Sequence, residues 1–452
     1  MKKYFVEIIA SNKQQLVQLQ KFELDLFSPT VKSIENEFSI EGLVTLDQVS
    51  KLVENGFKVI MKKEAMTKTP ATEESMPFGN WVEIAEKGFE VESREGTTEL
   101  SSSMLPFTGY LSSEGIDSAI RYISKNFPLI TELITLPKKT HQGRICKTIK
   151  IGTKNNVSKK GILLVGGVHA REVVNADLLV KLAFSLCKAF DSKTGLTFGG
   201  KSFTFENIKQ VVENIDLFVF PLANPDGRVY VQSPTGDVWW RKNRNPNPGL
   251  PAKGVDLNRN YDFLWHSGIG TSADPSSEIF KGTAPNSEPE TKNVIHLVNT
   301  YNNIICVLDI HSYSELILYP WGDDETQTHD PDMNFLNPVY DGVRGHLGDS
   351  DYREYIHKKD SDSYIFMGNK IKNAISSVRG KNYKVIQSMN LYPTTGTCHD
   401  FLYSLKFSGV KRDIFGYTIE TGTRFQPSYS EATKVMSEVS TGLVEICLEL
   451  SK

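Results

Sequence analysis

Four short apolar runs, each bounded by turn residues, constrain the fold of this 452-residue chain most strongly. Apolar runs of about four to eight residues, separated by helical patterns, are typical of buried strands in an α/β sheet. We therefore predict a mixed parallel and antiparallel central sheet sandwiched by helices. The four predicted strands are residues 161–165, 215–220, 304–310 and 416–419.

The first 62 residues predict a separate, small α+β unit of ferredoxin-like type. Residues 3–9 alternate like a strand, residues 13–24 have helical spacing, residues 37–40 are extended, and a capped helix from Thr45 precedes a strand at 57–61. Residues 63–107 are polar and contain prolines and glycines, which predicts a connecting segment. Residues 108–452 are then one large α/β domain.

The composition excludes several classes of function. Lys and Arg (51) nearly balance Asp and Glu (54), so the net charge of −3 gives no reason to expect nucleic acid or an anionic membrane as partner. The sequence contains no run long enough for a membrane span, and the apolar stretch at the N-terminus is too short for a signal-peptide core. The five scattered cysteines predict neither a disulfide framework nor a cysteine metal site.

Two residues that can bind zinc lie three apart in GGVHAREVVN, directly after the predicted strand 161–165. A turn that leads into a helix can direct His169 and Glu172 at one ion, because imidazole and carboxylate both bind Zn²⁺. The spacing also arises by chance, from a surface histidine and a glutamate that the helix dipole favours. Alone, this motif does not establish a metal site.

A third candidate ligand, His311, follows the apolar run 304–310. In open α/β sheets, functional residues collect at the carboxyl ends of strands. Two histidines and one glutamate leave one coordination position of Zn²⁺ open, which is the composition of a catalytic site. We therefore expect one zinc ion, bound by His169, Glu172 and His311.

Glu420 follows the predicted strand 416–419 and is a candidate general base. A zinc ion acidifies its bound water and polarises a carbonyl group, so hydrolysis also needs a group that takes the proton of the water. A carboxylate beside the ion can accept this proton and return it to the leaving amine. We expect a zinc-activated water as the nucleophile, with Glu420 as its base.

Two motifs between the predicted ligands contain arginines that can bind a substrate carboxylate. In GVDLNRNYD, Asn258 precedes Arg259, whose guanidinium offers two parallel donors to a carboxylate. In WWRKNR, Arg241 can stabilise a developing oxyanion. Arginine clusters are usually solvated, but this position beside two tryptophans favours a site. A zinc hydrolase with a carboxylate clamp is a carboxypeptidase.

The chain resembles the zinc carboxypeptidases of the pancreatic A/B type over roughly residues 108–450. Two histidines and one glutamate are also the zinc ligands known in carboxypeptidase A. Seven motifs carry the resemblance in the order of the family: HAREV, NPDGRVY, WWRKNR, GVDLNRNYD, DIHSYSELILYP, LYPTTGTCHDF and YTIETG. It implies the fold, the zinc ion and hydrolysis of the C-terminal peptide bond of peptides or proteins.

The same resemblance assigns roles to individual residues. It implies that Glu420 is the base and that Arg241 polarises the carbonyl. Asp256 would accept a hydrogen bond from a liganding histidine. The implied substrate contacts are Asn258, Arg259 and Tyr392 for the terminal carboxylate, and Arg171 and Tyr313 for outer parts of the substrate.

Two positions need separate argument. Tyr392 is chosen over Tyr403 because LYPTTGTCHDF has a tyrosine, a small glycine-bearing loop and an Asp-aromatic pair, as in the family. His399 stands where A-type enzymes have an apolar residue and B-type enzymes an acidic one. A histidine can hydrogen-bond polar side chains, attract acidic ones when protonated, or only line the wall. Basic specificity is disfavoured, and the other preferences stay open.

Two further segments have predicted places. The polar insertion at residues 324–365 is expected at the surface near the cleft. The N-terminal unit resembles the propeptide of the family and is expected to inhibit in cis, with cleavage between Lys87 and Pro106, at Lys87 or Arg94. A permanent accessory domain is the alternative. The resemblance implies an extracellular protein, but no signal peptide is present, so a cytoplasmic location is the alternative.

Two other functions fit parts of this pattern. A zinc amidohydrolase such as an N-acyl amino acid deacylase can share the HxxE motif and a distant histidine, but the set of Asn258, Arg259 and Tyr392 disfavours it. A catalytically inactive binding module is disfavoured by the intact Glu420 and metal ligands. A peptide with a free carboxylate, compared with its C-terminal amide, separates the three.

Overall fold

The fold was analysed in a computed structural model, which describes residues 2–22, 24–34, 37–65, 75–76, 99–101, 109–154, 158–346 and 350–452. Its centre is an eight-stranded sheet with the order β18-β15-β19-β14-β10-β13-β9-β8. The strands are β8 (Thr131–Lys139), β9 (Ile145–Ile151), β10 (Lys160–Gly166), β13 (Ile215–Phe220), β14 (Ile304–His311), β15 (Leu316–Tyr319), β18 (Lys384–Gln387) and β19 (Phe415–Glu420).

The four strands predicted from the apolar runs lie side by side in the middle of this sheet. β10 pairs in parallel with both β13 and β14, and β14 pairs in parallel with β19. Antiparallel neighbours β9 and β15 complete the mixed pattern. Because both faces of these central strands are covered, their residues are apolar without alternation. The predicted mixed sheet is confirmed.

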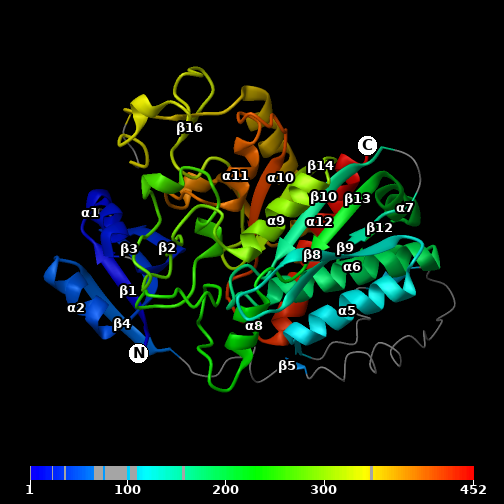
Figure 1. Cartoon of the computed structure of the whole chain (residues 1–452), viewed down its shortest axis with the longest axis horizontal. Helices are drawn as coiled ribbons and strands as arrows, with labels where there is room; N and C mark the ends of the chain where they lie inside the picture. Colours follow the sequence, from blue (N-terminus) through cyan, green and yellow to red (C-terminus); the bar gives the residue numbers. More distant parts are fainter. Residues whose placement is uncertain are drawn as a thin grey trace.

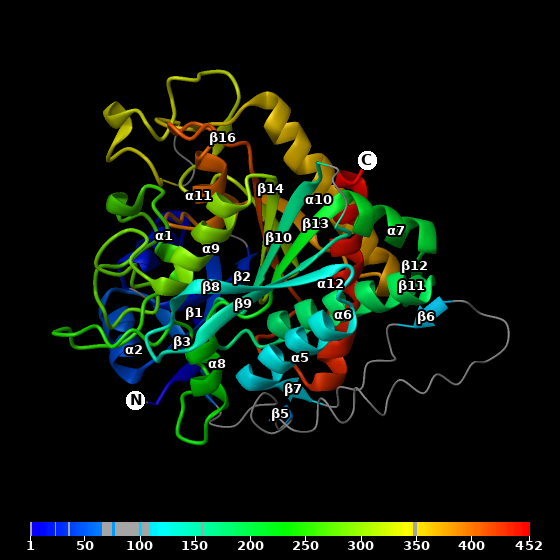
Figure 2. The same cartoon turned by 45° about the vertical axis from the view of Figure 1, so that its right-hand side comes forward.

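Helices cover both faces of the sheet (Figures 1 and 2). The helices α5, α6 and α12 lie on one face, whereas α9 and α11 lie on the other. Within the described residues, no helix is long and apolar enough to cross a membrane. The helices are α5 (Ser113–Asn126), α6 (Val174–Ser192), α7 (Phe205–Asn214), α8 (Pro225–Gln232), α9 (Pro289–Thr300), α10 (Lys358–Arg379), α11 (Cys398–Ser404) and α12 (Tyr429–Leu450).

The sequence of α5 explains why it forms and which face it buries. The Ser112 hydroxyl accepts a hydrogen bond from the Gly115 N–H and so caps the first turn. Ile116, Ile120 and Ile123 are buried, and their spacing of three and four places them on one side of the helix. In contrast, α6 is buried over nearly its whole length, because it packs between the sheet and α12.

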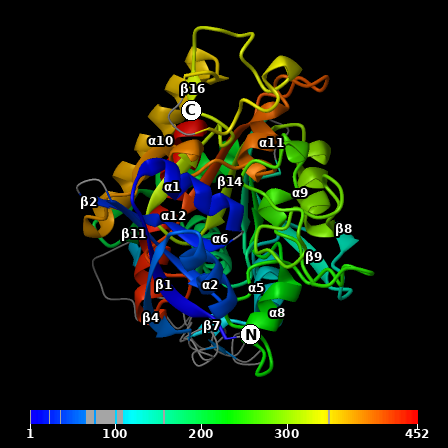
Figure 3. The ribbon, with the colours of Figure 1, turned by 90° about the vertical axis from the view of Figure 1, so that its left-hand side faces the viewer.

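The N-terminal unit is a four-stranded antiparallel sheet with the order β2-β3-β1-β4. Viewed from the side in Figure 3, this unit lies in front of the α/β domain. The order is that of a ferredoxin-like unit, as predicted. The predicted boundaries of the domains stay predictions. Its elements are β1 (Tyr4–Ala10), α1 (Lys13–Gln18), β2 (Asp25–Ile34), β3 (Glu37–Val44), α2 (Leu46–Glu54) and β4 (Lys58–Glu64).

Strand β2 is not among the strands predicted from the sequence. Ser28 and Pro29 interrupt its apolar pattern and resemble a turn, but proline is tolerated in an edge strand, and β2 lies at the edge of its sheet. The pairing with β3 also shifts register between Phe27 and Lys32. The expected cleavage points, Lys87 and Arg94, lie outside the described residues.

The insertion at residues 324–365 contains β16 (Thr326–Gln327), β17 (Glu354–Tyr355) and the start of α10. Asp323, directly before this insertion in the chain, is fully buried. Neither of its carboxylate oxygens has a hydrogen-bond partner among the described residues. Its carboxyl group faces that of Glu354. Burial raises the pKa of Asp323 to about 6 and the pKa of Glu354 well above its usual value.

The pH dependence of stability should report this buried pair. A carboxyl group whose pKa is raised on folding binds its proton more tightly in the folded state, so the free energy of unfolding falls as the pH rises from about 4 through 6. We expect Asp323→Asn to reduce the loss of melting temperature between about pH 4.5 and 7.5. Thermal melts at both pH values test this.

The exposed Asp332 of the same insertion provides the matched control. Asp332→Asn should leave the pH slope as in the wild type. Equal slopes for both variants would contradict the assignment to Asp323.

Candidate metal centre and substrate cleft

The three predicted metal ligands come together at the carboxyl ends of β10 and β14. His169 and Glu172 lie in the turn between β10 and α6, whereas His311 is the last residue of β14. The two strands are parallel neighbours, with Gly166 opposite Ile310. Their carboxyl ends therefore meet at one edge of the sheet, and the side chains that follow them face one another.

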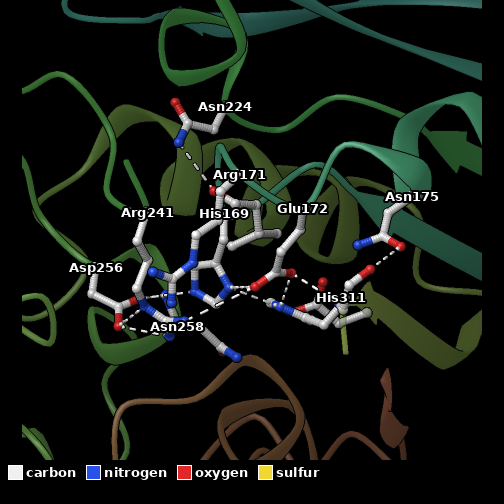
Figure 4. A network of polar contacts seen from close by, with 12 residues as sticks. His169, Arg171, Glu172, Asn175, Asn224, Arg241, Asp256, Asn258 and His311 are labelled. Carbon is white, nitrogen blue, oxygen red and sulfur yellow. Dashed lines mark hydrogen bonds and ion pairs between the residues drawn. The ribbon is translucent and has the colours of Figure 1, made fainter. Parts of the chain in front are cut away.

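The donor atoms of this group converge on one point (Figure 4). One carboxylate oxygen of Glu172 lies 2.8 Å from His169 Nδ1, and the other lies 3.1 Å from His311 Nδ1. The two Nδ1 atoms are 3.0 Å apart. All three residues are buried, with at most 3% of any one exposed.

Two carboxylates lie at the opposite side of the imidazole rings. His169 Nε2 is 3.0 Å from Asp256 Oδ1, and His311 Nε2 is 2.9 Å from Asp309 Oδ2. Each carboxylate favours a proton on the Nε2 that it faces, which leaves Nδ1 as an electron-pair donor. Such carboxylate–histidine pairs orient the ligands of metal ions.

This arrangement fits a zinc ion. A tetrahedral ion with bonds of about 2.0–2.2 Å holds its ligand atoms about 3.3 Å apart, close to the separations between these donors. Burial alone would raise the pKa of Glu172, but His169 and His311 hold it below its usual value. Burial would also lower the pKa of His311, but Asp309 and Glu172 hold it well above its usual value. The cluster therefore retains positive charge, which a cation can supply in place of a proton.

Glu420 lies beside the metal ligands without belonging to them. It ends β19 and stands opposite His311 in the parallel pairing of β14 and β19. Burial and the nearby charge of Glu172 raise the pKa of Glu420 to about 7. No hydrogen bond or ion pair holds its carboxylate among the described residues. A free carboxylate of this pKa can accept and release a proton near neutral pH.

Asp256 joins the metal ligands to Arg241. Its Oδ1 faces His169, while its Oδ2 accepts hydrogen bonds of 3.0 Å from Arg241. Burial alone would raise the pKa of Asp256, but Arg241 and His169 hold it well below its usual value. The guanidinium of Arg241 also reaches within 4.0 Å of Glu172. A fixed positive charge therefore lies at the edge of the metal cluster.

Arg259 and Tyr392 lie together in the same cleft. The two side chains are 3.4 Å apart at Arg259 Nη2 and Tyr392 Oη, and both line a cavity of about 1170 Å³ that Arg241 also lines. In contrast, the Tyr403 ring is fully buried and its hydroxyl donates to Asp360. The geometry is therefore compatible with Tyr392 and not with Tyr403 as a cleft residue.

The neighbours of Arg259 fix its backbone and side chain. Arg259 donates through Nε to the carbonyl of Gly270 at 2.8 Å. Gly396 packs so closely that a Cβ atom there would lie 2.3 Å from the Arg259 carbonyl oxygen, and its φ of +67° also favours glycine. Asn258 accepts a hydrogen bond from the Cys398 N–H at 2.8 Å through its side-chain oxygen. The glycine in LYPTTGTCHDF is thus needed for close packing.

The two predicted outer substrate residues face the N-terminal unit. The two terminal guanidinium nitrogens of Arg171, Nη1 and Nη2, donate to the carboxylate of Asp25 in β2, and the pair is buried. The ring of Tyr313 lies 6.0 Å from that of Phe27, also in β2. Phe425 packs against both rings.

His399 is buried and neutral. Its Nδ1 lies 3.0 Å from the hydroxyl of Thr418, and its Nε2 has no hydrogen-bond partner among the described residues. Burial, with the charges of His311 and Arg259, lowers the pKa of His399 to about 3. Because the His399 ring is neutral, it does not attract acidic side chains by charge.

Sequence reasoning missed two residues of this site. Asp309 lies two residues before His311, so both side chains point to one face of β14, and this spacing was a usable signal. Asp25 carried no such signal, because its partner Arg171 is 146 residues away in the chain. Contacts between domains are not visible in local patterns.

Comparison with known proteins places the larger part of this chain in a family. The family model for zinc carboxypeptidases matches residues 116–441. The chain is 28% identical over 308 residues to carboxypeptidase A4 of Mus musculus. This alignment covers 68% of the present chain and 61% of the mouse protein. The chain is 29% identical over 331 residues to carboxypeptidase B of Helicoverpa zea, covering 72% and 70%. The matched part is thus less than two thirds of the mouse protein.

Two solved structures share the fold over nearly the whole chain. Carboxypeptidase A from Helicoverpa armigera superposes with a TM-score of 0.69 at 21% identity, covering 99% of this chain and 97% of that one. Thrombin activatable fibrinolysis inhibitor superposes with a TM-score of 0.67 at 18% identity, covering 100% and 99%.

The carboxylate behind His311 should tune metal affinity. Asp309→Ala removes the group that orients the His311 ring, so we expect the affinity for Zn²⁺ to fall about 10- to 100-fold. Competition with a chelator measures this affinity. The exposed Asp362 supplies the control, because Asp362→Ala should leave it unchanged. An unchanged affinity in Asp309→Ala would show that Asp309 does not support the metal site.

Proposed function

This chain belongs to the zinc carboxypeptidase family, and on that basis we propose that it is a metallocarboxypeptidase that removes the C-terminal residue of peptides or proteins. The observation that carries the proposal is one cavity shared by Arg241, Arg259 and Tyr392, beside a cluster of two histidines and one glutamate. Hydrolysis of the last peptide bond needs the cluster of two histidines and one glutamate. Recognition of the terminal carboxylate needs the side chains that line the cavity.

The proposed zinc ligands are His169, Glu172 and His311, whose donor atoms already converge. When bound, zinc supplies Lewis-acid chemistry, since it polarises a carbonyl group and acidifies a water molecule. Asp256 and Asp309 keep the two Nδ1 atoms directed at that position.

Glu420 moves the proton in the proposed reaction. Its carboxylate takes the proton of the attacking water and returns it to the nitrogen of the leaving amino acid. Its position opposite His311 supports this role, as does its lack of a competing partner among the residues that the structure describes. Arg241 stabilises the charge that develops on the carbonyl oxygen, and Asp256 holds its guanidinium in place.

Arg259 selects the end of the chain in this proposal. Its guanidinium binds the terminal carboxylate, with Asn258 and Tyr392 beside it, and this contact distinguishes a carboxypeptidase from an internal protease. Because His399 is buried and does not line this cavity, the preference for the terminal side chain stays open.

The choice between a free carboxylate and an amide tests this function. We expect the wild type to cleave a peptide with a free C-terminus at least about 100-fold faster than its C-terminal amide, because only the former pairs with Arg259. Arg259→Gln should lose about 100-fold in kcat/KM on the free peptide and little on the amide. Chromatography of the released amino acids measures both rates.

Two controls make the outcome specific. Arg121→Gln changes an exposed arginine that pairs with Asp117, and it should behave as wild type. Glu420→Gln should abolish cleavage of both peptides and keep zinc binding. Equal cleavage of peptide and amide would contradict a carboxypeptidase, cleavage restricted to N-acyl amino acids would favour a deacylase, and binding without cleavage an inactive module.

We further propose that the N-terminal unit keeps the enzyme latent. Asp25 pairs with Arg171, and Phe27 packs against Tyr313 and Phe425, so the unit covers the predicted outer substrate contacts. Lys3 also forms an ion pair of 2.8 Å with Glu278. Leu24, Asp25 and Leu26 line the cavity that Arg259 lines.

Weakening this contact should release activity. Asp25→Ala leaves Arg171 buried without its partner, which costs about 3–5 kcal/mol of docking free energy. We therefore expect peptide hydrolysis to rise at least about 10-fold. Cutting the chain at a protease site introduced between residues 87 and 106 should also raise peptide hydrolysis. Asp47→Ala, on the exposed surface of α2, is the control. Unchanged activity in both treatments would leave a permanent accessory domain as the better account.

A further inference from the structure

A second group of metal-binding side chains lies outside the site described above. His141 is in the turn between β8 and β9, while Glu288 and Glu290 stand at the start of α9. One nitrogen of His141 and one oxygen of each glutamate all lie within 4.8 Å of one another. The residues come from segments about 150 positions apart, so the fold alone brings them together.

The contacts of the two glutamates leave part of this group unsatisfied. Glu288 Oε2 lies 2.9 Å from His141 Nε2, and the Asn243 amide donates to Glu288 and Glu290 at 2.7 and 3.1 Å. Asn245 also donates to Glu288. Glu290 Oε1, however, is buried without a hydrogen-bond partner in the part of the chain that the structure describes. A buried carboxylate oxygen without a donor is costly unless a ligand binds it.

The balance of charge also favours a cation. Glu288 and Glu290 are only 2% and 1% exposed, and the one ionisable base in contact with either of them, among the described residues, is His141. Burial and the charge of Glu288 raise the pKa of Glu290 to about 7. Nearby Asp226 adds little to this negative charge, because Arg144 already pairs with it at 2.8 Å. Two adjacent buried carboxylates need a proton or a cation between them.

We propose that His141, Glu288 and Glu290 form a second binding site, for a divalent cation of the zinc or manganese class. An imidazole nitrogen together with carboxylate oxygens is a donor set that suits these ions. The side chain of His141 is 27% exposed, which opens the site to solvent and leaves room for water ligands. On binding, the cation takes the place of the proton between His141 Nε2 and Glu288 Oε2, and that proton passes to solvent.

The second site braces the segment that carries Arg241. Asn243 and Asn245 follow Arg241 by two and four residues, and both hold Glu288. The side-chain oxygen of Asn243 accepts a hydrogen bond from the Val255 N–H at 2.8 Å, next to Asp256. A cation that fixes the two glutamates therefore stiffens the support of Arg241 and Asp256. Its role is structural, and its existence does not depend on the proposed catalytic function.

Counting bound zinc tests the second site. Metal-stripped protein is dialysed against Zn²⁺ alone and its metal content is measured after removal of free ion. We expect two equivalents in the wild type and one in His141→Ala, whose substitution lies in a partly exposed turn. Glu290→Gln, which keeps the size of the side chain, should also bind one equivalent. Mn²⁺ in place of Zn²⁺ distinguishes the two ions of the class.

The controls separate this site from the first one and from surface histidines. His296→Ala, on the same helix α9, should keep two equivalents. His311→Ala should lose one equivalent and still show a rise in melting temperature with Zn²⁺, and this rise should vanish in His141→Ala/His311→Ala. One equivalent in both the wild type and His141→Ala overturns the proposal, as does an equal loss in His296→Ala. An inactive wild type that binds two equivalents refutes the catalytic proposal alone.

Discussion

The convergence of two buried imidazole nitrogens and one buried carboxylate is the constraint on which the functional part of this molecule depends. His169 Nδ1 and His311 Nδ1 lie 3.0 Å apart. Two nitrogen lone pairs at this distance repel one another unless a proton or a cation lies between them. The parallel pairing of β10 with β14 creates this proximity, and the pairing of β14 with β19 adds Glu420. The order of four buried strands therefore determines where a metal ion and a base can meet.

Buried carboxylates transmit this constraint to the cleft. Asp256 contacts His169 with one oxygen and Arg241 with the other, so the proposed metal ligand and the proposed oxyanion-stabilising residue cannot move independently. Through Asn258, whose N–H also donates to Asp256, the same carboxylate fixes the start of the segment that holds Arg259. A single substitution at Asp256 would thus disturb three proposed functions at once.

Local patterns reveal what lies on one strand or one turn, and they fail where the partner is distant. The run 215–220 predicted β13 to the residue, because a strand buried on both faces is apolar throughout. The proximity of the proposed ligands His169, Glu172 and His311 could be predicted from strand ends. The edge strand β2 could not, because Pro29 imitates a turn. The pairing of Asp25 with Arg171 and the meeting of His141 with Glu288 are consequences of tertiary structure, and only coordinates reveal them.

The contact between the N-terminal unit and the α/β domain explains how a chain cut could change activity under the proposed latency. While the connector is intact, the effective concentration of the N-terminal unit at its docking surface is on the order of millimolar. If the dissociation constant of the unit from that surface is near micromolar, the unit is docked about 99.9% of the time. After a cut, docking becomes bimolecular, and at enzyme concentrations well below micromolar the same contact dissociates. The buried pair of Asp25 with Arg171, the ion pair of Lys3 with Glu278 and the aromatic contacts around Phe27 hold the unit against the α/β domain. A larger apolar interface would hold the unit in place after cleavage, and a fully exposed one would not hold it before.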